Sequence, residues 1–356
     1  MENPALVIDH DGSAFMRAGF AGDEVPAVCK PSVASGGSGL AATHVWSDAF
    51  TELGVSPSHH HILLADAAGN QEGRNILAEI FFEQFEAPGL YFVEQPILAL
   101  ASEGCTSGLV VDLAYNTTRI VPVHDGKLLR LGFDAVPAGT THGMAGRQLA
   151  AFMASMVQTA APGLTEAMLL PDIYHLAYVA SNFPAECAAC TANPAEFERT
   201  YVLPDGKELR IGAERFRCGE ALFDPAIAGN AGLAGLHHTV HDVLERCDGM
   251  VPSQTRGSPG SVGGGQLAQN VLLVGDGAHL DGMAARLQTG VSALLPSMGQ
   301  VFVRASAAGG AAPWVGGSII ASMLKPEQWV SLHEYSEEGP SVVQRKCGDW
   351  PGFQSP

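Results

Sequence analysis

The first residues of the chain combine a short apolar run with an aspartate and a glycine–serine turn. The run ALVID spans residues 5–9, the turn HDGS follows at 10–13, and a basic residue comes soon after. A turn at the end of a strand can direct backbone N–H groups at a phosphate, and a nearby cation neutralises its charge. The pattern therefore predicts a first strand that leads into a phosphate loop, with the binding residues Asp9, Gly12, Ser13 and Arg17.

A second apolar strand also ends in an aspartate, at Asp112. The run GLVVD at 108–112 is followed by an apolar run at 119–124, by Asp-Gly at 125–126 and by a further short run at 128–131. Asp-Gly between two apolar runs is a hairpin signal. Two strands that each end in aspartate suggest a duplicated unit, and hence two lobes that hold a ligand in the cleft between them.

Other segments predict helices and one long loop. Apolar residues recur with a helical period through 75–86, and 143–157 and 283–287 also favour helix. By contrast, 251–266 is rich in Gly and Ser and contains too few apolar residues to pack. This segment therefore predicts a flexible insertion.

The net charge of −18 over 356 residues narrows the possible partners. Contacts with nucleic-acid phosphates need clustered Lys and Arg, so direct nucleic-acid binding is not expected. No run approaches the ~18 consecutive apolar residues of a membrane-spanning helix, so no membrane contact is expected. The seven scattered cysteines, without an apolar N-terminal signal segment, are typical of a reducing compartment.

Two short motifs resemble metal-binding patterns, but neither has the ligands that a metal site requires. Cys187 and Cys190 form a lone CxxC with no second ligand pair at a suitable spacing. The run His59-His60-His61 precedes an apolar strand, and consecutive residues of an extended chain point to alternating faces. We therefore expect an incidental cysteine pair, a solvated histidine loop and no metal.

Long runs along nearly the whole chain resemble the actin and actin-related protein family. The opening is similar to the family's DNGSGxxKAGFAGD, and LPDGKELRIGAERFRCGEALFDP at 203–225 is similar to a long family segment. Further likeness lies at 46–55, 314–322 and 334–347. The resemblance implies an actin-like fold, in which two duplicated ribonuclease-H-like α/β lobes surround a nucleotide cleft.

The resemblance also implies lobe boundaries. The expected parts are a small lobe, or first subdomain, at 1–103 and 312–356 and a large lobe at 104–311, which divides into a third subdomain at 104–144 and 232–311 and a fourth at 145–231. Residues 34–45 are all that remains of the family's second subdomain. About a dozen residues rich in Gly and Ser cannot build a packed sheet. One filament contact is therefore missing, and self-polymerisation is not expected.

Two loops that hold phosphate in actins are altered here. The first loop is one residue longer than the family's and adds Asp11 beside the site. A like charge near a phosphate costs on the order of a few kcal/mol in a poorly hydrated cleft. After Asp112 the family's Gly-x-Gly pattern is replaced by LAYN, so the glycines that let backbone N–H groups approach phosphate are gone.

The segments that contact adenosine in the family have also changed. The loop 272–282 keeps Gly275 and Gly277 but places Asp276 where the family has a glycine. The segment 172–176, near the family's adenine, is one residue short and lacks its Lys-Glu pair. A negative charge therefore enters a place that the family keeps for close approach.

Three polar residues still match the family's magnesium-shell and water-orienting positions, namely Asp9, Gln95 and Asp112. They indicate either a retained Mg–nucleotide centre or strand-end groups kept for hydrogen bonding, and we favour the second interpretation. Arg119 stands where the family has the histidine that places the attacking water, and an arginine cannot accept a hydrogen bond from it. We expect a vestigial site without catalytic residues and without a cofactor; bound ATP or ADP with Mg²⁺ is the alternative.

A groove for partner helices is a further implication of the resemblance. In actins the groove between the first and third subdomains receives amphipathic helices, which bind through anchors at i, i+3 and i+4. The matching positions here are small or apolar: Ala101, Gly104, Thr106, Ile320 and Met323. The alternative is that Ile320 and Met323 are core residues of their own helix.

The sequence as a whole favours a non-polymerising actin-related protein that serves as a structural subunit of a larger complex. The expected setting is cytoplasmic and cytoskeletal or motor-associated, with protein partners and no enzymatic activity. One alternative is a working ATPase in which Arg17 and Arg119 both clamp phosphates, since arginine suits phosphate. Another is a nuclear subunit of a chromatin remodeller.

Overall fold

The computed structural model describes most of the chain, in two compact units. It describes residues 3–9, 15–31, 39–66, 71–129, 140–169, 172–203, 206, 208–250, 263–295 and 299–347. The first unit comprises 1–110, 121–139 and 306–356, and the second comprises 111–120 and 140–305. The expected lobe boundaries differ from this division at 104–110, 121–139 and 306–311, and they stay predictions.

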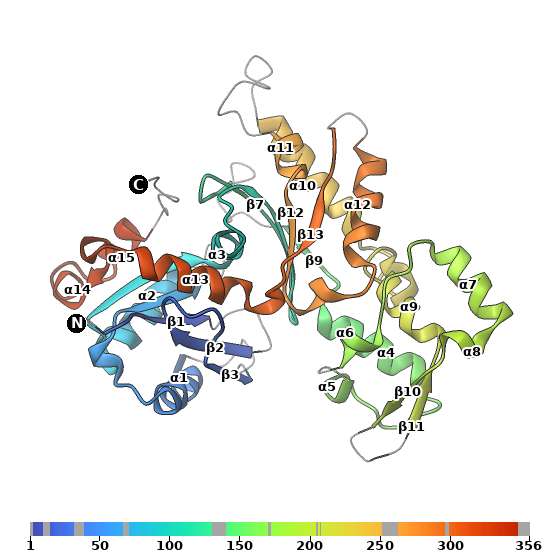
Figure 1. Cartoon of the computed structure of the whole chain (residues 1–356), viewed down its shortest axis with the longest axis horizontal. Helices are drawn as coiled ribbons and strands as arrows, with labels where there is room; N and C mark the ends of the chain where they lie inside the picture. Colours follow the sequence, from blue (N-terminus) through green and yellow to red (C-terminus); the bar gives the residue numbers. More distant parts are fainter. Residues whose placement is uncertain are drawn as a thin grey trace. The chain divides into compact units, whose positions relative to one another are not determined.

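A six-stranded sheet forms the centre of the first unit (Figure 1). Its order is β14-β5-β4-β1-β2-β3, and β5, β4 and β1 run parallel to one another. These three strands are buried along their whole length, which explains their near-continuous apolar sequences. The strands are β1 Leu6–Asp9, β2 Phe15–Phe20, β3 Val28–Pro31, β4 Ile62–Asp66, β5 Gly89–Glu94 and β14 Val330–Ser331.

Helices α3 and α13 pack against each other and against this sheet (Figure 1). The approach is close at Gly316, where an added Cβ would lie 1.8 Å from the Leu98 carbonyl oxygen. The buried Trp314 donates a hydrogen bond from its indole N–H to the Val7 carbonyl at 3.1 Å. The helical elements of this unit are α1 Gly39–Leu53, η1 Pro57–His59, α2 Gln71–Glu79, η2 Ile80–Gln84, α3 Gln95–Ser102, η5 Gly309–Ala311, α13 Ala312–Met323, η6 Pro326–Gln328, α14 Leu332–Glu338 and α15 Ser341–Lys346.

A second six-stranded sheet has the order β13-β12-β6-β7-β8, with β9 paired to β7. Its β6–β7–β8 part contains the predicted strands, and β7 and β8 form the predicted hairpin. The turn residues Asp125 and Gly126 have φ of 47° and 71°, the left-handed values that a tight hairpin needs. The strands are β6 Gly108–Leu113, β7 Thr118–His124, β8 Lys127–Leu128, β9 Thr140–His142, β12 Val271–Val274 and β13 Val303–Ala305.

Outside this sheet, the second unit is mainly helical and includes a two-stranded antiparallel ribbon, β10 Arg199–Val202 with β11 Glu208–Ile211. The predicted helices 143–157 and 283–287 are present with shifted ends, as α4 and α12. The helical elements are α4 Gly146–Val157, α5 Glu166–Leu169, α6 Ile173–Leu176, α7 Phe183–Ala192, α8 Pro194–Phe197, α9 Ala213–Glu220, η3 Pro225–Ala228, α10 Leu236–Met250, α11 Gly264–Ala268, η4 Asp276–His279 and α12 Met283–Leu294.

Two predicted loops are partly helical. Residues 39–45 of the expected remnant 34–45 form the start of α1, and 34–38 lie outside the described residues. The predicted insertion 251–266 is wrong at its end, because α11 begins at Gly264. An added Cβ at Gly264 would lie 2.0 Å from the Leu244 carbonyl oxygen, so this glycine serves close packing against α10. Residues 251–262 lie outside the described part of the chain.

The prediction of a solvated histidine loop is wrong for two of its three residues. His60 is buried, with Nδ1 2.8 Å from the Pro4 carbonyl oxygen. The ring of His61 packs on Trp329 at a centroid distance of 5.0 Å. Only His59 is exposed. The run fails as a loop because it leads directly into the central strand β4, whose neighbours cover it.

The described residues contain no cluster of metal-ligating side chains and no helix fit to span a membrane. Within them, no group of three or more His, Cys, Asp or Glu side chains is arranged to hold a metal ion. All seven cysteines are free thiols. Among the helices in the described ranges, none combines the length and apolar character needed to cross a bilayer.

Candidate functional site

In the first unit, the predicted residues Asp9 and Gln95 are bonded to each other. Asp9 is the last residue of β1, and Gln95 is the first residue of α3, directly after β5. Because β1 and β5 both run parallel to β4, their carboxyl ends meet at one edge of the sheet. The Gln95 amide Nε2 donates to Asp9 Oδ1 at 2.7 Å, and both side chains are buried.

Arg17 compensates the charge of Asp9. It is the cross-strand partner of Asp9 in the β1–β2 pair, and only 6% of it is exposed. Its Nη1 lies 3.8 Å from Asp9 Oδ2. A buried carboxylate needs such a partner, because an isolated buried charge is strongly unfavourable. The predicted residues Gly12 and Ser13 lie outside the described part of the chain.

In the second unit, the structure brings Asp112 and Gly275 together. Gly275 follows β12 with φ of 84°, a left-handed value that suits glycine. A Cβ added there would lie 2.7 Å from Asp112 Oδ1 and 2.7 Å from the Leu113 carbonyl oxygen. A side chain at Gly275 would therefore collide with the end of β6, so packing and backbone conformation both require the glycine.

Gly277 and Gly146 contact Tyr174, a residue that was not among the predicted site residues. A Cβ at Gly277 would lie 3.2 Å from Tyr174 Cε1. A Cβ on Gly146, the first residue of α4, would fall on the Tyr174 hydroxyl. The only sequence signal for Tyr174 was the missing residue in segment 172–176.

The hydroxyl of Tyr174 is buried in this unit. It has no hydrogen-bond partner within the residues that the structure describes. Burial, and then the carboxylates of Asp276 and Asp112, raise the pKa of Tyr174 well above its usual range. Two carboxylates and a neutral phenol are thus the groups that this unit gathers beside Gly277. None of these three described groups is a cation that could pair with a polyphosphate.

The five predicted groove residues all belong to the first unit but differ in exposure. Ala101 and Ile320 are each 1% exposed and are part of the core between α3 and α13. Met323, near the end of α13, is 51% exposed, and Gly104 is exposed as well. Thr106 is partly buried. The accessible part of the predicted groove is therefore its edge, at Gly104, Thr106 and Met323.

Comparison with models of known protein families matches the Actin family over residues 38–164 and 174–348, which is most of the chain. The chain belongs to the actin family. The two-sheet α/β architecture is consistent with this, so the expected membership and actin-like fold are confirmed.

The matched ranges contain some of the predicted site residues of this actin-family chain and leave out others. Gln95, Asp112, Gly275 and Gly277 all lie within the matched ranges. The first phosphate-loop segment, from Asp9 to Arg17, precedes them. The interruption at 165–173 ends just before Tyr174. Two segments that the resemblance assigns to the nucleotide are thus outside the similarity or at its edge.

Proposed function

We propose that this actin-family protein is a non-polymerising structural subunit of a larger protein complex and that its nucleotide site is degenerate. The observation that carries the proposal is Tyr174, whose ring and hydroxyl pack on Gly146 and Gly277 beside two carboxylates. The segment 172–176 is the one that the family resemblance assigns to the neighbourhood of adenine. A side chain of the protein thus takes space that the resemblance gives to a ligand.

The first unit supports the same proposal. Asp9, which matches a magnesium-shell residue, accepts a hydrogen bond from Gln95 and lies near Arg17. A carboxylate with a donor and a cation in place can persist without a metal, because its charge and one of its oxygens are already compensated. These contacts favour the interpretation that the two side chains are kept for rigidity.

Titration of the full chain with fluorescent ATP and Mg²⁺ tests the degenerate site. We expect no saturable binding in the micromolar range. Micromolar or tighter binding that is abolished in Asp112→Ala would contradict the proposal. The wild-type protein at equal concentration with fluorescent ATP and EDTA is the control for binding that does not depend on the metal.

The structural role has its own tests. Under polymerising salt conditions the protein should stay in the supernatant after ultracentrifugation, whereas filaments formed by the protein alone would refute the non-polymerising role. Affinity capture from whole-cell extract should recover stoichiometric protein companions of a cytoskeletal or motor complex. Capture with a chromatin-remodelling complex would instead favour the nuclear alternative.

The exposed edge of the groove gives this capture a control. Met323 is half exposed at the end of α13 and can anchor an amphipathic helix, whereas Ile320 is core. We therefore expect Met323→Asp to reduce capture of a helix-bearing companion. An equal substitution at the exposed Val202 of β10 should leave capture unchanged.

A second candidate function, an ATPase with rearranged loops, has one observation in its favour. Gly275 keeps its left-handed conformation beside Asp112, as a loop that approaches a ligand closely would require. Under this candidate, ATP turnover would depend on Arg119 as well as on Asp112. Turnover in the wild type that disappears in both Asp112→Ala and Arg119→Gln would favour it over the structural role.

A further inference from the structure

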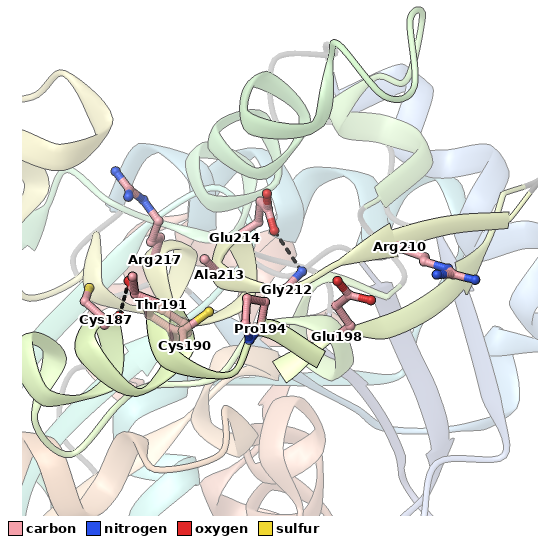
Figure 2. Close-up of a pocket in the computed structure, with 11 residues that line it drawn as sticks. Cys187, Cys190, Thr191, Pro194, Glu198, Arg210, Gly212, Ala213, Glu214 and Arg217 are labelled. Atoms are coloured by element: carbon pink, nitrogen blue, oxygen red, sulfur yellow. Dashed lines mark hydrogen bonds between the residues drawn. The ribbon is translucent and has the colours of Figure 1, made fainter. Parts of the chain in front are cut away.

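A cavity of about 340 Å³ lies in the second unit, at the CxxC motif (Figure 2). Its walls come from α7, α8, β11 and α9, which contribute both cysteines, Pro194, Arg210 and Arg217. The volume is within the range of small-molecule sites, about 300–1,000 Å³. This cavity is separate from the residues on which the proposed function rests.

Two arginines on its walls are without an acidic partner. Within the described residues, the guanidinium groups of Arg210 and Arg217 make no hydrogen bond or ion pair. Both arginine side chains are exposed, so their guanidinium groups are open to a ligand, and the same walls also carry Glu198 and Glu214. Arginine binds carboxylates through paired N–H donors. The walls therefore suit a ligand with more than one carboxylate.

The acidic residues of the cavity differ in their availability. Glu214 Oε2 already accepts a hydrogen bond from the Gly212 N–H at 2.8 Å, as Figure 2 shows. Glu198 is exposed, and in Figure 2 it lies toward the same end of the cavity as Arg210. A carboxylate there can pair with an ammonium group. A small peptide that carries several carboxylates and an amine has these features.

The two thiols occupy one face of α7. Cys187 and Cys190 are three residues apart, so they lie one above the other on the helix surface. Cys190 is buried in a cluster with Ala180 and Phe216, and this burial raises the pKa of its thiol. Cys187 is only partly buried. Of the two thiols, Cys187 is the one that a ligand in the cavity can reach.

We propose that this cavity binds a small anionic peptide disulfide and that Cys187 reacts with it to form a mixed disulfide. The Cys187 thiolate attacks one sulfur of the disulfide, a new S–S bond forms, and the original S–S bond breaks. The departing thiolate takes up the proton that Cys187 lost, so no other oxidant is needed. Arg210 and Arg217 hold the carboxylates of the ligand.

The mixed disulfide is the final product. Side chains at i and i+3 of a helix have Cβ atoms about 5–6 Å apart. A disulfide requires about 3.5–4.5 Å between the two Cβ atoms. Helix α7 therefore keeps Cys190 too far from Cys187 to displace the bound thiol.

The first test uses the wild-type protein alone. It is treated with oxidised glutathione, an anionic disulfide, or with the neutral bis(2-hydroxyethyl) disulfide, and the modified cysteines are identified by peptide mass spectrometry. Cys29 is an exposed thiol on β3 and serves as the internal control. We expect the ratio of Cys187 to Cys29 modification to be at least about threefold higher with the anionic disulfide, since two nearby cations favour it. Equal ratios with the two reagents would overturn the proposal.

Variants then locate the charge effect. Arg217→Gln and Arg210→Gln should each lower the ratio for oxidised glutathione and leave the ratio for the neutral disulfide unchanged. The control is Arg246→Gln on α10, whose guanidinium bonds the Thr140 hydroxyl and lies outside the cavity walls. An equal effect of all three substitutions would show that the preference for the anionic disulfide comes from the overall charge of the protein, and it would refute the site. An internal Cys187–Cys190 disulfide as the product would refute the assigned end state.

Discussion

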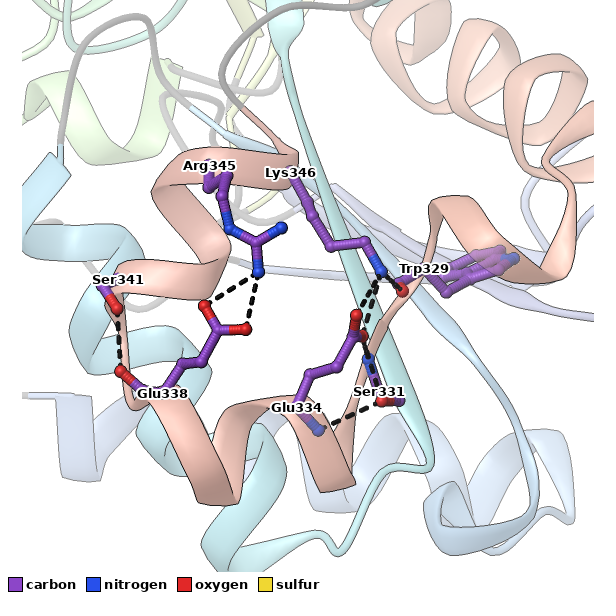
Figure 3. A network of polar contacts seen from close by, with 7 residues as sticks. All are labelled: Trp329, Ser331, Glu334, Glu338, Ser341, Arg345 and Lys346. Carbon is purple, nitrogen blue, oxygen red and sulfur yellow. Dashed lines mark hydrogen bonds and ion pairs between the residues drawn. The ribbon is translucent and has the colours of Figure 1, made fainter.

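Removal of the Glu334 carboxylate tests how the last two helices are held. Figure 3 shows this side chain between α14 and α15. Its oxygens accept hydrogen bonds from the Ser331 N–H at 2.9 Å, the Ser331 hydroxyl at 3.0 Å and the Lys346 ammonium at 2.9 Å. The Lys346 ammonium also donates to the Trp329 carbonyl at 2.6 Å. One carboxylate thus caps α14 and joins it to α15.

The expected loss follows from these contacts. Hydrogen bonds to a charged group each contribute about 1.5–3 kcal/mol when shielded from water. A third of the Glu334 side chain is exposed, at 33%, so solvent screening reduces the effect. For Glu334→Gln we expect a loss of about 1–2 kcal/mol in the free energy of unfolding at pH 7. A double-mutant cycle with Lys346→Met should give a coupling of about 1 kcal/mol.

The same carboxylate predicts a pH dependence. Hydrogen bonds from Ser331 and then from Lys346 lower the pKa of Glu334 from 4.5 to about 2. Because the folded-state pKa is below the unfolded one, the contribution is complete above about pH 5 and is lost as the pH falls toward about 2. The loss caused by Glu334→Gln should therefore be smaller near pH 3 than near pH 7.

Urea unfolding, followed by circular dichroism, measures both effects. The matched control is Glu338→Gln. Glu338 bonds Arg345 at 2.7 and 2.8 Å, but its side chain is 44% exposed, so the expected change is within about 0.5 kcal/mol. Equal losses in the two variants, or a loss for Glu334→Gln that does not change between pH 7 and about pH 3, would refute the reasoning.

Three further substitutions test the packing of the two units by the same unfolding assay. Gly316→Ala should cost about 2–4 kcal/mol, because its Cβ would lie 1.8 Å from a carbonyl oxygen of α3; Gly232→Ala, with nothing within 4 Å, should be neutral. Arg74→Met leaves the buried carboxylates of Asp66 and Glu94 without their cation and should cost about 3–5 kcal/mol. Lys30→Met, which removes a more exposed ion pair, should cost less than about 0.5 kcal/mol. Tyr174→Phe removes a buried hydroxyl that has no partner in the described residues, so it should raise stability by about 0.5–1 kcal/mol.

The sequence predicted the elements whose signals are local. The hairpin at Asp125 and Gly126 follows from two residues that adopt positive φ, and the strand before Asp112 follows from its apolar run. The end of α2 shows the limit of such signals. The predicted helix 75–86 continues past Glu79 as one π-helical turn through Gln84, which a period of 3.6 residues cannot distinguish from a regular helix.

The sequence did not predict features that depend on contacts between distant segments. His60 is buried because Pro4 lies beside it, 56 residues away in the chain. Arg74 is only 4% exposed because Asp66 and Glu94, at the ends of two neighbouring strands, bind its guanidinium, and because the Cys347 carbonyl accepts a third contact. Neither partner set is implied by the spacing of residues around His60 or Arg74. Tyr174 belongs to the same class, since its neighbours come from α4 and η4.

The two candidate functions differ in what they require of Gly275. An ATPase needs this glycine for the close approach of a ligand, whereas a structural subunit needs it because Asp112 and Leu113 leave no space for a Cβ. The second requirement holds with or without a nucleotide, so the persistence of the glycine in this family member fits both candidates and does not separate them. The same holds for Asp9 and Gln95, which satisfy each other at 2.7 Å. The residue that separates the candidates is Tyr174. It packs on glycines of the protein where adenosine is expected, and this favours the structural subunit.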